Sequence, residues 1–383
     1  MSALKEDILT SELVTNPADD LDVLVSQYNT CLKSILDIHA PIETITLKPK
    51  KNPWYSQEIH ILRQNKRAFQ RKFKKTRADS DLHNLIQCRD DLKSLIRSTK
   101  VNYFSKLIND AQFDQGNLFR RVKSMLNKKN SVPIPENTSE TEFCNELNEF
   151  FITKIEAIRA EFNDLDNTHC HDFDETAVSQ PLRKLEPVTI EKVVTMVSKS
   201  ASKTCDLDPC PTSVLKLCIT ELAPTITDII NLSLQSAKVP TALKHATVTP
   251  RLKKPTLPTV PKSFRPVSNL PYISKLIEQA VLDQLNTHFD RNNLVETYQS
   301  GYKAKHSTET ALLYITNNLL QKLDQNEAIL IAFLDLSAAF DVVDHRILLD
   351  RLNKSQGIEE DALQWIKSYL SGRTQQVRIG ESQ

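Results

Sequence analysis

Apolar residues recur every three or four positions over most of the chain, the spacing that places them on one face of an α-helix. Between residues 54 and 110 this pattern begins at Ile59 and Leu62 and continues to Leu95 and Ile96, which predicts one or two long helices. Weaker or shorter runs predict further helices over residues 21–36, 140–162, 189–197, 214–222, 224–237, 274–290 and 308–323.

Three shorter stretches have the pattern of β-strands. Two of them cover residues 246–249 and residues 375–379. The third runs from Ile329 to Leu334, six consecutive apolar residues, which is typical of a strand buried on both faces. Asp335 follows it directly, and residues 337–340 are expected to begin a helix. The chain is therefore predicted to be an α/β protein that is mostly helical.

Charge is distributed unevenly along the 383 residues, although the net charge is only +1. Residues 48–129 contain 21 lysines and arginines against 7 acidic residues, a net charge of +14. Residues 130–186 contain 4 basic residues against 13 acidic ones, a net charge of −9. Such separation usually means that different segments have different partners.

The basic excess is concentrated on the first predicted long helix. One interpretation is a charged, solvated surface helix, and the other is a face that follows the phosphates of a nucleic acid. We favour the second, because so one-sided a set of charges repels itself unless an anion is present. The candidate nucleic-acid-binding residues are Arg63, Lys66, Arg67, Arg71, Lys72, Lys74, Lys75 and Arg77.

Composition excludes several classes of protein. The chain has only five glycines and no cluster of them, which argues against a Rossmann fold or a P-loop. Its seven cysteines are odd in number and form no CxxC pair, so neither a disulfide framework nor a zinc ribbon is expected. The run from His169 to His171 cannot close a tetrahedral metal site alone, and a linker is the better interpretation.

The location of the protein is predicted from its apolar runs. No run reaches the ~18 apolar residues of a membrane helix, so no membrane partner is expected. The first residues carry acidic side chains where a secretory signal needs basic and then apolar ones. We expect an intracellular protein in the nucleus, the cytoplasm or both, and not a secreted one.

Asp335 is the residue with the clearest potential for chemistry. A carboxylate beside so apolar a run is costly to desolvate unless cations or hydrogen bonds compensate. Spacing alone gives about equal weight to a cap for the following helix and to a metal ligand. A phosphatase with a nucleophilic aspartate also has an apolar strand before it. That class needs a second carboxylate two residues on, where this chain has Ser337.

Residues 333–345, FLDLSAAFDVVDH, resemble motif A of reverse transcriptases from non-LTR (LINE-type) retrotransposons of the jockey and chicken-repeat-like groups. Four other blocks resemble the same family, and all five stand in the family's order over about residues 188–383. The stretch around Trp54 resembles, less specifically, the connector that follows the endonuclease in these elements. The four other blocks are CDLDPCP (205–211), SFRPVSNL (263–270), YQSGYKAKHST (298–308) and YLSGRTQQV (369–377).

The resemblance implies a right-hand polymerase, represented here by the fingers and the first part of the palm, that performs two-metal nucleotidyl transfer with Mg²⁺. By motif position, Asp335 would bind both ions, and the backbone carbonyl of Leu336 would be a further ligand. Phe340 matches the steric gate that disfavours a 2′-hydroxyl, a role compatible with that of an ordinary core aromatic. For Asp341 and for the Asp344-His345 pair the motif assigns no metal, and capping or structural roles are expected.

The fingers block supplies the expected nucleotide contacts. Arg265 matches a cation that contacts the incoming triphosphate, where a guanidinium binds two phosphate oxygens. Lys253 and Lys254 would contact template or triphosphate, or are surface lysines. If this interpretation holds, Asp335 lines a cleft and Arg265 lies on the same face. The partners implied are an RNA template, a DNA primer and dNTPs, and the sequence sets no oligomeric state.

The resemblance divides the chain into four segments. Residues 1–47 leave room for the tail of an upstream endonuclease, and residues 48–129 form a basic helical connector. Residues 130–187 form an acidic helical segment and linker. Residues 188–383 form the N-terminal part of a reverse transcriptase domain.

Later motifs of the family have no match in these residues. The family continues with a glycine-proline-glutamine stretch and a hairpin that carries two adjacent aspartates. With one carboxylate a pair of Mg²⁺ ions has too few ligands, so this chain alone is expected to be an inactive fragment. Uncovered apolar palm surface and an exposed strand edge are expected to make it poorly soluble. The alternatives are a retrotransposon-derived protein that binds nucleic acid without chemistry, and a degenerate reading frame.

Overall fold

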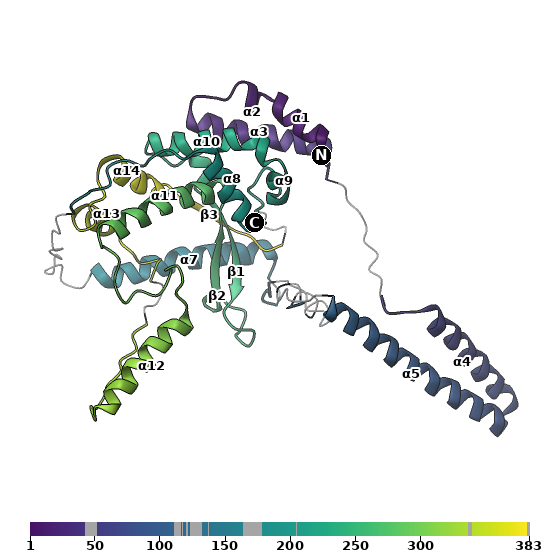
Figure 1. Ribbon diagram of the computed structural model, residues 1–383. Coiled ribbons are helices and arrows are strands. Elements are labelled where there is room, and N and C mark those ends of the chain that lie inside the picture. The colour runs from purple at the N-terminus through teal and green to yellow at the C-terminus, as the bar shows by residue number, and fades with distance from the viewer. Residues whose placement is uncertain are drawn as a thin grey trace. The chain divides into compact units, whose positions relative to one another are not determined.

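The computed structural model describes most of the chain as two compact units (Figure 1). The main unit consists of Met1–Ile42 and Val132–Gln383, and the arm unit consists of Glu43–Ser131. The residues described are 1–42, 52–110, 116, 118–119, 122, 132–136, 138–163, 178–203, 205–335 and 339–380.

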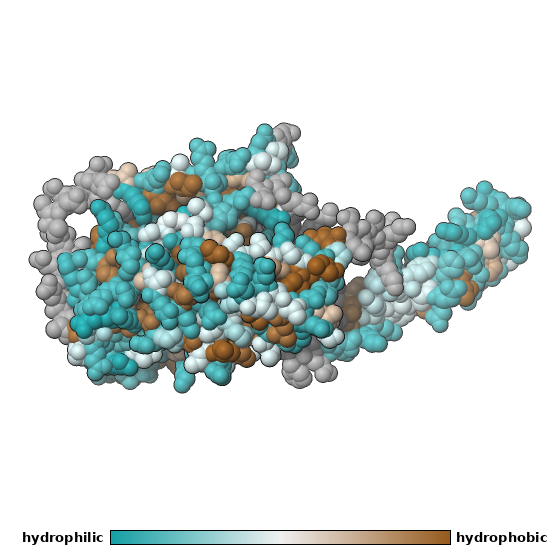
Figure 2. Space-filling view, turned by 90° about the horizontal axis from the view of Figure 1, so that it is seen from above, coloured by the Kyte–Doolittle hydropathy of each residue, from teal (hydrophilic) through white to brown (hydrophobic). Residues whose placement is uncertain are grey.

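The arm unit contains two long helices, α4 (Gln57–Thr76) and α5 (Asp79–Asn109), which confirms the expectation of one or two helices in this region. The Ser56 side chain caps α4 by accepting a hydrogen bond from the Ile59 backbone N–H. Arg77 ends α4 in the left-handed region, with φ of 53°, and α5 begins two residues later. The helices pack as a hairpin through Ile59, Cys88 and other buried side chains. Figure 2 shows that the surface of this hairpin is mostly hydrophilic.

Three N-terminal helices belong to the main unit: α1 (Ser2–Thr10), α2 (Glu12–Thr15) and α3 (Leu21–His39). Asp20 caps α3 by accepting a hydrogen bond from the Val23 backbone N–H. Leu13, Leu24 and Tyr28 are almost completely buried, and they join the same apolar cluster as helix α10 (Ile219–Gln235). This first segment is therefore an integral layer of the main unit's core. The expectation that it contains the tail of an endonuclease stays a prediction.

Helix α10 forms the centre of that core. Its buried residues include Leu222, Ile226 and Ile230. The sequence predicted a break before Pro224, and this was wrong: helix α9 (Thr212–Leu217) ends at Cys218, and Pro224 lies inside α10. Burial on both sides of the proline stabilises the helix more than the one missing backbone donor destabilises it.

Four more helices of the main unit complete this layer or extend from it. They are α8 (Ile190–Lys199), α11 (Tyr272–Arg291), α13 (His345–Lys354) and α14 (Glu360–Leu370). The predicted helices at 189–197 and 274–290 are thereby confirmed. Trp365 of α14 is buried and donates from its ring nitrogen to the Ser233 hydroxyl at 3.1 Å.

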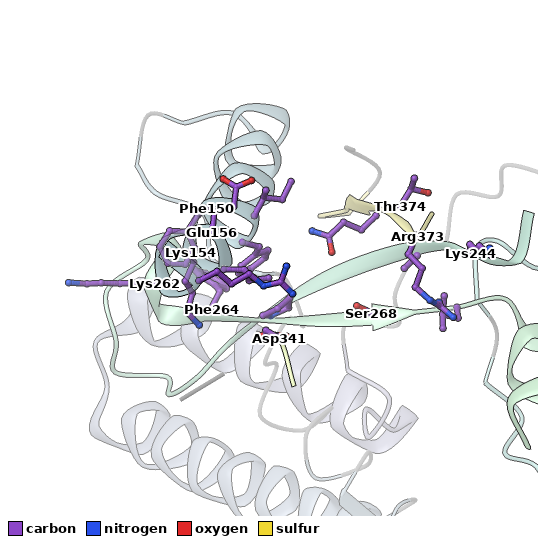
Figure 3. A pocket seen from close by; sticks show the side chains of 18 of the residues that line it. Phe150, Lys154, Glu156, Lys244, Lys262, Phe264, Ser268, Asp341, Arg373 and Thr374 are labelled. Atoms are coloured by element: carbon purple, nitrogen blue, oxygen red, sulfur yellow. The ribbon is translucent and has the colours of Figure 1, made fainter. Parts of the chain in front are cut away.

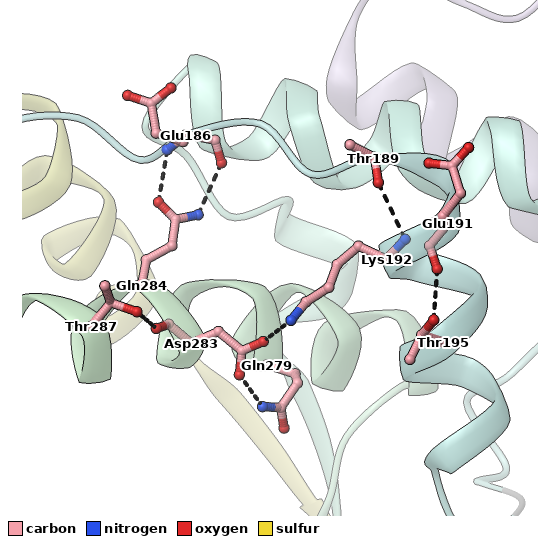
Figure 4. A network of polar contacts seen from close by, with 9 residues as sticks. All are labelled: Glu186, Thr189, Glu191, Lys192, Thr195, Gln279, Asp283, Gln284 and Thr287. Carbon is pink, nitrogen blue, oxygen red and sulfur yellow. Dashed lines mark hydrogen bonds and ion pairs between the residues drawn. The ribbon is translucent and has the colours of Figure 1, made fainter.

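Polar side chains connect the segment before α8 to its neighbours (Figure 4). The Gln284 side chain accepts from the Glu186 backbone N–H at 2.7 Å and donates to its carbonyl at 2.9 Å. Lys192 pairs with Asp283 of α11, and Asp283 also accepts from Gln279. These contacts hold residues 186–192 against α11.

The sheet has three strands in the order β2-β1-β3. Strands β1 (His245–Leu252) and β2 (Phe264–Asn269) are antiparallel, whereas β3 (Thr374–Val377) pairs with β1 in parallel. Short 3-10 turns at Thr241–Leu243 and Pro261–Ser263 precede β1 and β2. The strands predicted at 246–249 and 375–379 are confirmed with shifted bounds.

Helix α7 (Glu140–Asn163) is the predicted acidic helix, and it crosses one face of this sheet (Figure 1). Phe143 and Leu147 of α7 pack against Val248 and Phe264 of the sheet in a second, smaller core. Phe143 and Phe264 meet edge to face, with ring centroids 5.6 Å apart. The tail from residue 164 to 177, including the His169–His171 run, lies outside the described residues.

The strand predicted for Ile329 to Leu334 is not formed, and this expectation was wrong. Residues 327–335 have no regular structure, and Leu330, Phe333 and Leu334 are 97%, 83% and 93% exposed. Helix α12 (Thr308–Asp324), predicted correctly from its periodicity, likewise buries none of its residues. Within the described part of the chain no strand pairs with this segment, and an unpaired strand leaves its backbone groups and apolar side chains in water.

The helix expected to begin at residues 337–340 is also not found in the described part. Ala339 to Val342 form turns, and the next helix, α13, begins at His345. Leu336 and Ser337 lie outside the described residues.

Candidate functional site

The β1–β2 hairpin carries the predicted nucleotide-contacting residues. Side chains alternate along β2, so Phe264 faces α7 whereas Arg265 is exposed on the opposite face. Arg265 pairs in register with Arg251 of β1, which places two arginines together on that face. Lys253 follows β1 directly, and its backbone N–H donates to the Ser263 carbonyl at 2.9 Å. Lys254 is exposed next to it.

The face of the sheet that carries Arg265 also has a small cleft of about 290 Å³. Arg378 and Asp206 form an ion pair of 2.7 Å across it. Asp206 comes from the 205–211 block and Arg378 follows the 369–377 block, so these two blocks and β2 meet at the sheet. The lining residues are Cys205, Asp206, Thr247, Thr249, Asn269, Arg378 and Gly380.

Asp208 connects the 205–211 block to helix α11. Its carboxylate accepts from the Tyr272 backbone N–H at 2.6 Å and from the Cys205 backbone N–H at 3.1 Å. Burial raises the pKa of Asp208, while these two hydrogen bonds act in the opposite direction. The block is thereby held at the start of the helix that follows β2.

Asp335, the predicted metal ligand, is exposed at the end of the irregular segment. Neither Asp335 nor Arg265 lines the clefts on the two faces of the sheet. Among the residues that the structure describes, no three His, Cys, Asp or Glu side chains lie close enough to hold a metal ion. The metal role of Asp335 stays a prediction, and Leu336 lies outside the described residues.

Phe340, the predicted steric gate, is 76% exposed. Its ring meets that of Tyr302 edge to face, with the centroids 5.9 Å apart. The alternative role as an ordinary core aromatic is therefore wrong for this structure. The contact does join two of the sequence blocks, because Tyr302 belongs to the 298–308 block.

Asp344 has the capping role that was expected for it. Its carboxylate accepts from the backbone N–H groups of Arg346 at 2.7 Å and Ile347 at 3.3 Å, at the start of α13. Hydrogen bonds from the Arg346 side chain and backbone lower the pKa of Asp344. His345 is the first residue of α13.

Replacing Asp344 with alanine is expected to lower the free energy of unfolding by about 1 kcal/mol, because the first turn loses its cap. Urea denaturation at pH 7 measures this, with Asp341→Ala as the exposed control. A lowered carboxyl pKa stabilises the fold above the ordinary pKa and loses this effect as the pH falls through the lowered value. The difference between the two proteins should therefore shrink below about pH 4. If Asp344→Ala were as stable as the unchanged chain at pH 7, the Asp344 side chain would not stabilise α13.

A larger cleft, with a volume of about 830 Å³, lies between α7 and the other face of the sheet (Figure 3). Lys253 contributes to its lining, and so does Asp341. Five further cations in it were not singled out from the sequence: Lys154, Arg159, Lys244, Lys262 and Arg373. Arg373 could have been found from its place in the 369–377 block. Lys154 and Arg159 could not, because they come from a segment whose net charge is negative.

The candidate cations of α4 have different surroundings in the arm unit. Lys72 forms an ion pair of 2.9 Å with Asp81, and hydrogen bonds from Thr76 and Lys72 lower the pKa of that carboxyl. Arg63 lies over the ring of Tyr55 and Arg77 over that of Phe73, at 5.1 and 5.9 Å. Lys66 is half-buried. The exposed remainder comprises Arg67, Arg71, Lys74 and Lys75.

Spacing places four of these cations on one side of α4. Arg63, Arg67, Arg71 and Lys74 follow one another at intervals of four, four and three residues, which aligns them along one helix face. The only acidic residue of α4 is Glu58, at its first turn. Phe69 and Phe73 are half-buried, whereas the cations of this row are exposed. We call Arg63, Arg67, Arg71 and Lys74 the cationic row.

The part of the chain that the structure describes contains no helix both long enough and apolar enough to cross a membrane.

Comparison with known proteins connects these features to one family. The family described as reverse transcriptase (RNA-dependent DNA polymerase) matches residues 252–383, which include strand β2 with Arg265 and also Asp335. The RNA-directed DNA polymerase from mobile element jockey of Drosophila melanogaster is 27% identical over 237 residues, 61% of this chain and 26% of the relative. Its Drosophila funebris counterpart is 29% identical over 189 residues, 49% of this chain and 20% of the relative.

A third relative extends the similarity over more of the chain. The probable RNA-directed DNA polymerase from transposon BS of Drosophila melanogaster is 24% identical over 300 residues, 76% of this chain and 33% of the relative. The chain thus spans between a fifth and a third of the length of these relatives. Residues 252–383 are thus similar to the reverse transcriptase family, and the chain resembles the RNA-directed DNA polymerases of jockey-like mobile elements.

Proposed function

We propose that this chain is part of an RNA-directed DNA polymerase of a mobile element, and that it supplies the fingers and the first part of the palm. The observation that carries this proposal is the convergence of three sequence blocks on one small sheet. Residues 205–211, the strand with Arg265 and the 369–377 block lie far apart in sequence and meet at β1 and β2. Such a surface, with Arg251 and Arg265 side by side, suits the phosphates of a nucleotide or a template strand.

The proposed roles follow the motif positions. Arg265 contacts the triphosphate of the incoming dNTP, and Lys253 and Lys254 contact the triphosphate or the template. Asp335 acts at the reacting phosphate, and Phe340 limits the sugar to one without a 2′-hydroxyl. In the whole protein the partners are an RNA template and a DNA primer.

Mg²⁺ is the cofactor that this family implies, and the described residues do not fit it. Asp335 stands without two further metal-ligating side chains within the described part of the chain. Two-metal catalysis needs several oxygen ligands at short range.

Primer extension on an RNA template tests the proposal. The chain is joined to the part of the jockey polymerase that follows the matched region, and extension with dNTPs and Mg²⁺ is compared for the unchanged fusion and Asp335→Asn. The substitution keeps the size of the side chain but removes its charge. We expect a rate loss of at least about 100-fold, in the range seen when one group that stabilises developing charge is removed.

The control is Asp324→Asn in the same fusion, because this exposed aspartate at the end of α12 lines neither cleft and has no assigned role at the reacting phosphate. It is expected to retain most of the activity. Extension by both variants at the rate of the unchanged fusion would contradict the role of Asp335. The 383-residue chain alone, assayed in parallel, is expected to bind nucleic acid and to give no extension.

A second function is favoured by the cationic row of the arm unit. We propose that α4 binds a nucleic acid through its phosphates, whether or not the chain takes part in polymerisation. The row is exposed and one-sided in charge, and the aromatic residues beside it are half-buried against α5. Stacking on bases therefore contributes little, and recognition is independent of sequence and strongly dependent on salt.

A further inference from the structure

The cleft between α7 and the sheet contains an unusual excess of positive charge. Six cations line it and only two carboxylates do, Glu156 and Asp341. In Figure 3 both carboxylates lie toward the end of the cleft marked by Phe150 and Phe264, away from Arg373 and Lys244. The six cations are Lys154, Arg159, Lys244, Lys253, Lys262 and Arg373.

Arg373 is held in place with part of its hydrogen-bonding capacity unused. Its Nε donates to the Tyr369 carbonyl at 2.6 Å, and its guanidinium carbon lies 4.0 Å from the centre of the Tyr369 ring. Its Nη2 is buried and has no hydrogen-bond partner in the part of the chain that the structure describes. A buried donor on a charged group is costly to leave unpaired, so an acceptor at this position would stabilise the structure.

Lys244 increases this imbalance. It lines the same end of the cleft, and its ammonium is 3.5 Å from the Ser368 hydroxyl. Burial lowers the pKa of Lys244, Arg373 lowers it further, and Asp22 opposes the shift. Two cations that repel each other in a partly buried place are stabilised by an anion bound between them.

We propose that Arg373 and Lys244 form a binding site for a nucleotide phosphate at this end of the cleft. The planar guanidinium offers donors in a fork that matches two phosphate oxygens, and the ammonium adds a point charge. Ser268 and Thr374 line the cleft nearby and offer hydroxyl groups (Figure 3). This site lies on the face of the sheet opposite to Arg265, so it is distinct from the proposed contact of Arg265 with the triphosphate.

The rest of the cleft suits the other parts of a nucleotide. Phe150 and Ile155 of α7, both half-buried, form an apolar wall on which a base can stack. The volume of about 830 Å³ is within the usual ~300–1,000 Å³ of small-ligand sites. The phosphate belongs either to a nucleic-acid strand that enters the cleft or to a free nucleotide.

A purely structural role for Arg373 explains less of the geometry. An arginine after the end of α14 stabilises the last carbonyls of the helix, and the bond from Nε to Tyr369 does this. That role leaves Nη2 without a partner and gives no reason for Lys244 to lie beside a second cation. An anion accounts for both.

Binding measurements on the full chain test the site. All variants carry Arg67→Gln, Arg71→Gln and Lys74→Gln, so that the cationic row contributes little. Fluorescence anisotropy follows a labelled ten-nucleotide uridine strand, and unlabelled dATP without metal serves as competitor. Lys244→Gln and Arg373→Gln are each expected to weaken binding about tenfold, the effect of losing one hydrogen bond to a charged group. Arg373→Lys should recover part of this loss, because it restores the charge but not the fork.

Lys184→Gln is the matched control, since Lys184 is an exposed lysine of the main unit that does not line this cleft. If dATP displaces the strand from the protein that retains Lys244 but not from Lys244→Gln, the site binds a free nucleotide. Lys244-dependent binding of the strand without displacement by dATP assigns it to nucleic acid. Equal affinity of Lys244→Gln and Lys184→Gln for both ligands overturns the site. The Lys244 side chain makes one hydrogen bond to the described residues, at 3.5 Å, so its variant decides the matter even if Arg373→Gln fails to fold.

The inference does not depend on the polymerase assignment. Loss of binding in Lys244→Gln supports the phosphate site whether or not the fusion protein extends a primer. A fusion that is active and tolerates Lys244→Gln would leave the polymerase proposal standing and remove only this site.

Discussion

Replacing Leu24 with alanine is expected to lower the free energy of unfolding of the main unit by about 2–5 kcal/mol, the cost of opening a cavity in a well-packed core. Leu24 lies on α3 and is 0% exposed. It belongs to the same cluster as Ile226 and Ile230 of α10, about two hundred residues later in the chain. The large effect therefore depends on α3 being part of this core.

The measurement uses the chain's two tryptophans. Trp54 belongs to the arm unit and is changed to phenylalanine in all variants, so that the buried Trp365 reports on the main unit alone. Val23→Ala is the neighbouring control, because Val23 is 55% exposed and should change stability by no more than about 0.5 kcal/mol. If Leu24→Ala leaves the Trp365 transition where it was, residues 1–42 do not belong to this core.

Neutralising three members of the cationic row, Arg67→Gln, Arg71→Gln and Lys74→Gln, is expected to weaken nucleic-acid binding on the order of 100-fold at 0.1 M salt. Each lysine or arginine that neutralises a phosphate releases counterions, so three fewer contacts flatten the slope of log affinity against log salt by about 2 for single strands and about 3 for duplexes. Anisotropy titrations at several salt concentrations give both quantities.

A matched triple variant on the other helix separates position from net charge. Lys93→Gln, Arg97→Gln and Lys106→Gln remove the same charge from exposed positions of α5, where basic and acidic residues are mixed. This variant should bind nearly as well as the unchanged chain. Equal losses in the two triple variants would mean that binding follows overall charge, and the face of α4 would have no special role.

Local patterns predicted the elements whose stability is mainly local. The periodicity of Ile59, Leu62 and Phe73 predicted the two arm helices, because an amphipathic helix shows its buried face within a few turns. The cap at Asp344 was predicted for the same reason, since a capping side chain bonds backbone groups two or three residues away. The acidic helix α7 followed its pattern equally well.

These local patterns could not predict long-range packing. Nothing local in α3 indicates that Tyr28 packs with residues of α10, or that β3 pairs with β1 in parallel. Pro224 led to a wrong prediction for the related reason that burial of the apolar residues of α10 outweighs a local helix-breaking preference. Arg373 and Lys244 come together only through the pairing of β3 with β1, so no sequence pattern joins them.

The segment before Asp335 shows the limit of apolarity as a signal for strands. Six apolar residues indicate that burial is favourable, but a strand forms only beside a partner that accepts and donates its backbone hydrogen bonds. In the described structure Phe333 and Leu334 have no such neighbour and are exposed. Arg265 was predicted from its motif position, whereas Arg251 is identified as its neighbour only by the pairing of the two strands.

The packing of α3 on α10 has a consequence for synthesis on the ribosome. The first helices leave the exit tunnel long before their partner, and at about 5–20 residues per second the wait from His39 to Gln235 is about 10–40 s. During that interval the apolar side of α3, including Leu24 and Tyr28, has no native neighbour. The arm hairpin, whose contacts are local, is complete within the same interval. Nascent chains should therefore bind holdase chaperones through residues 1–42 until α10 emerges.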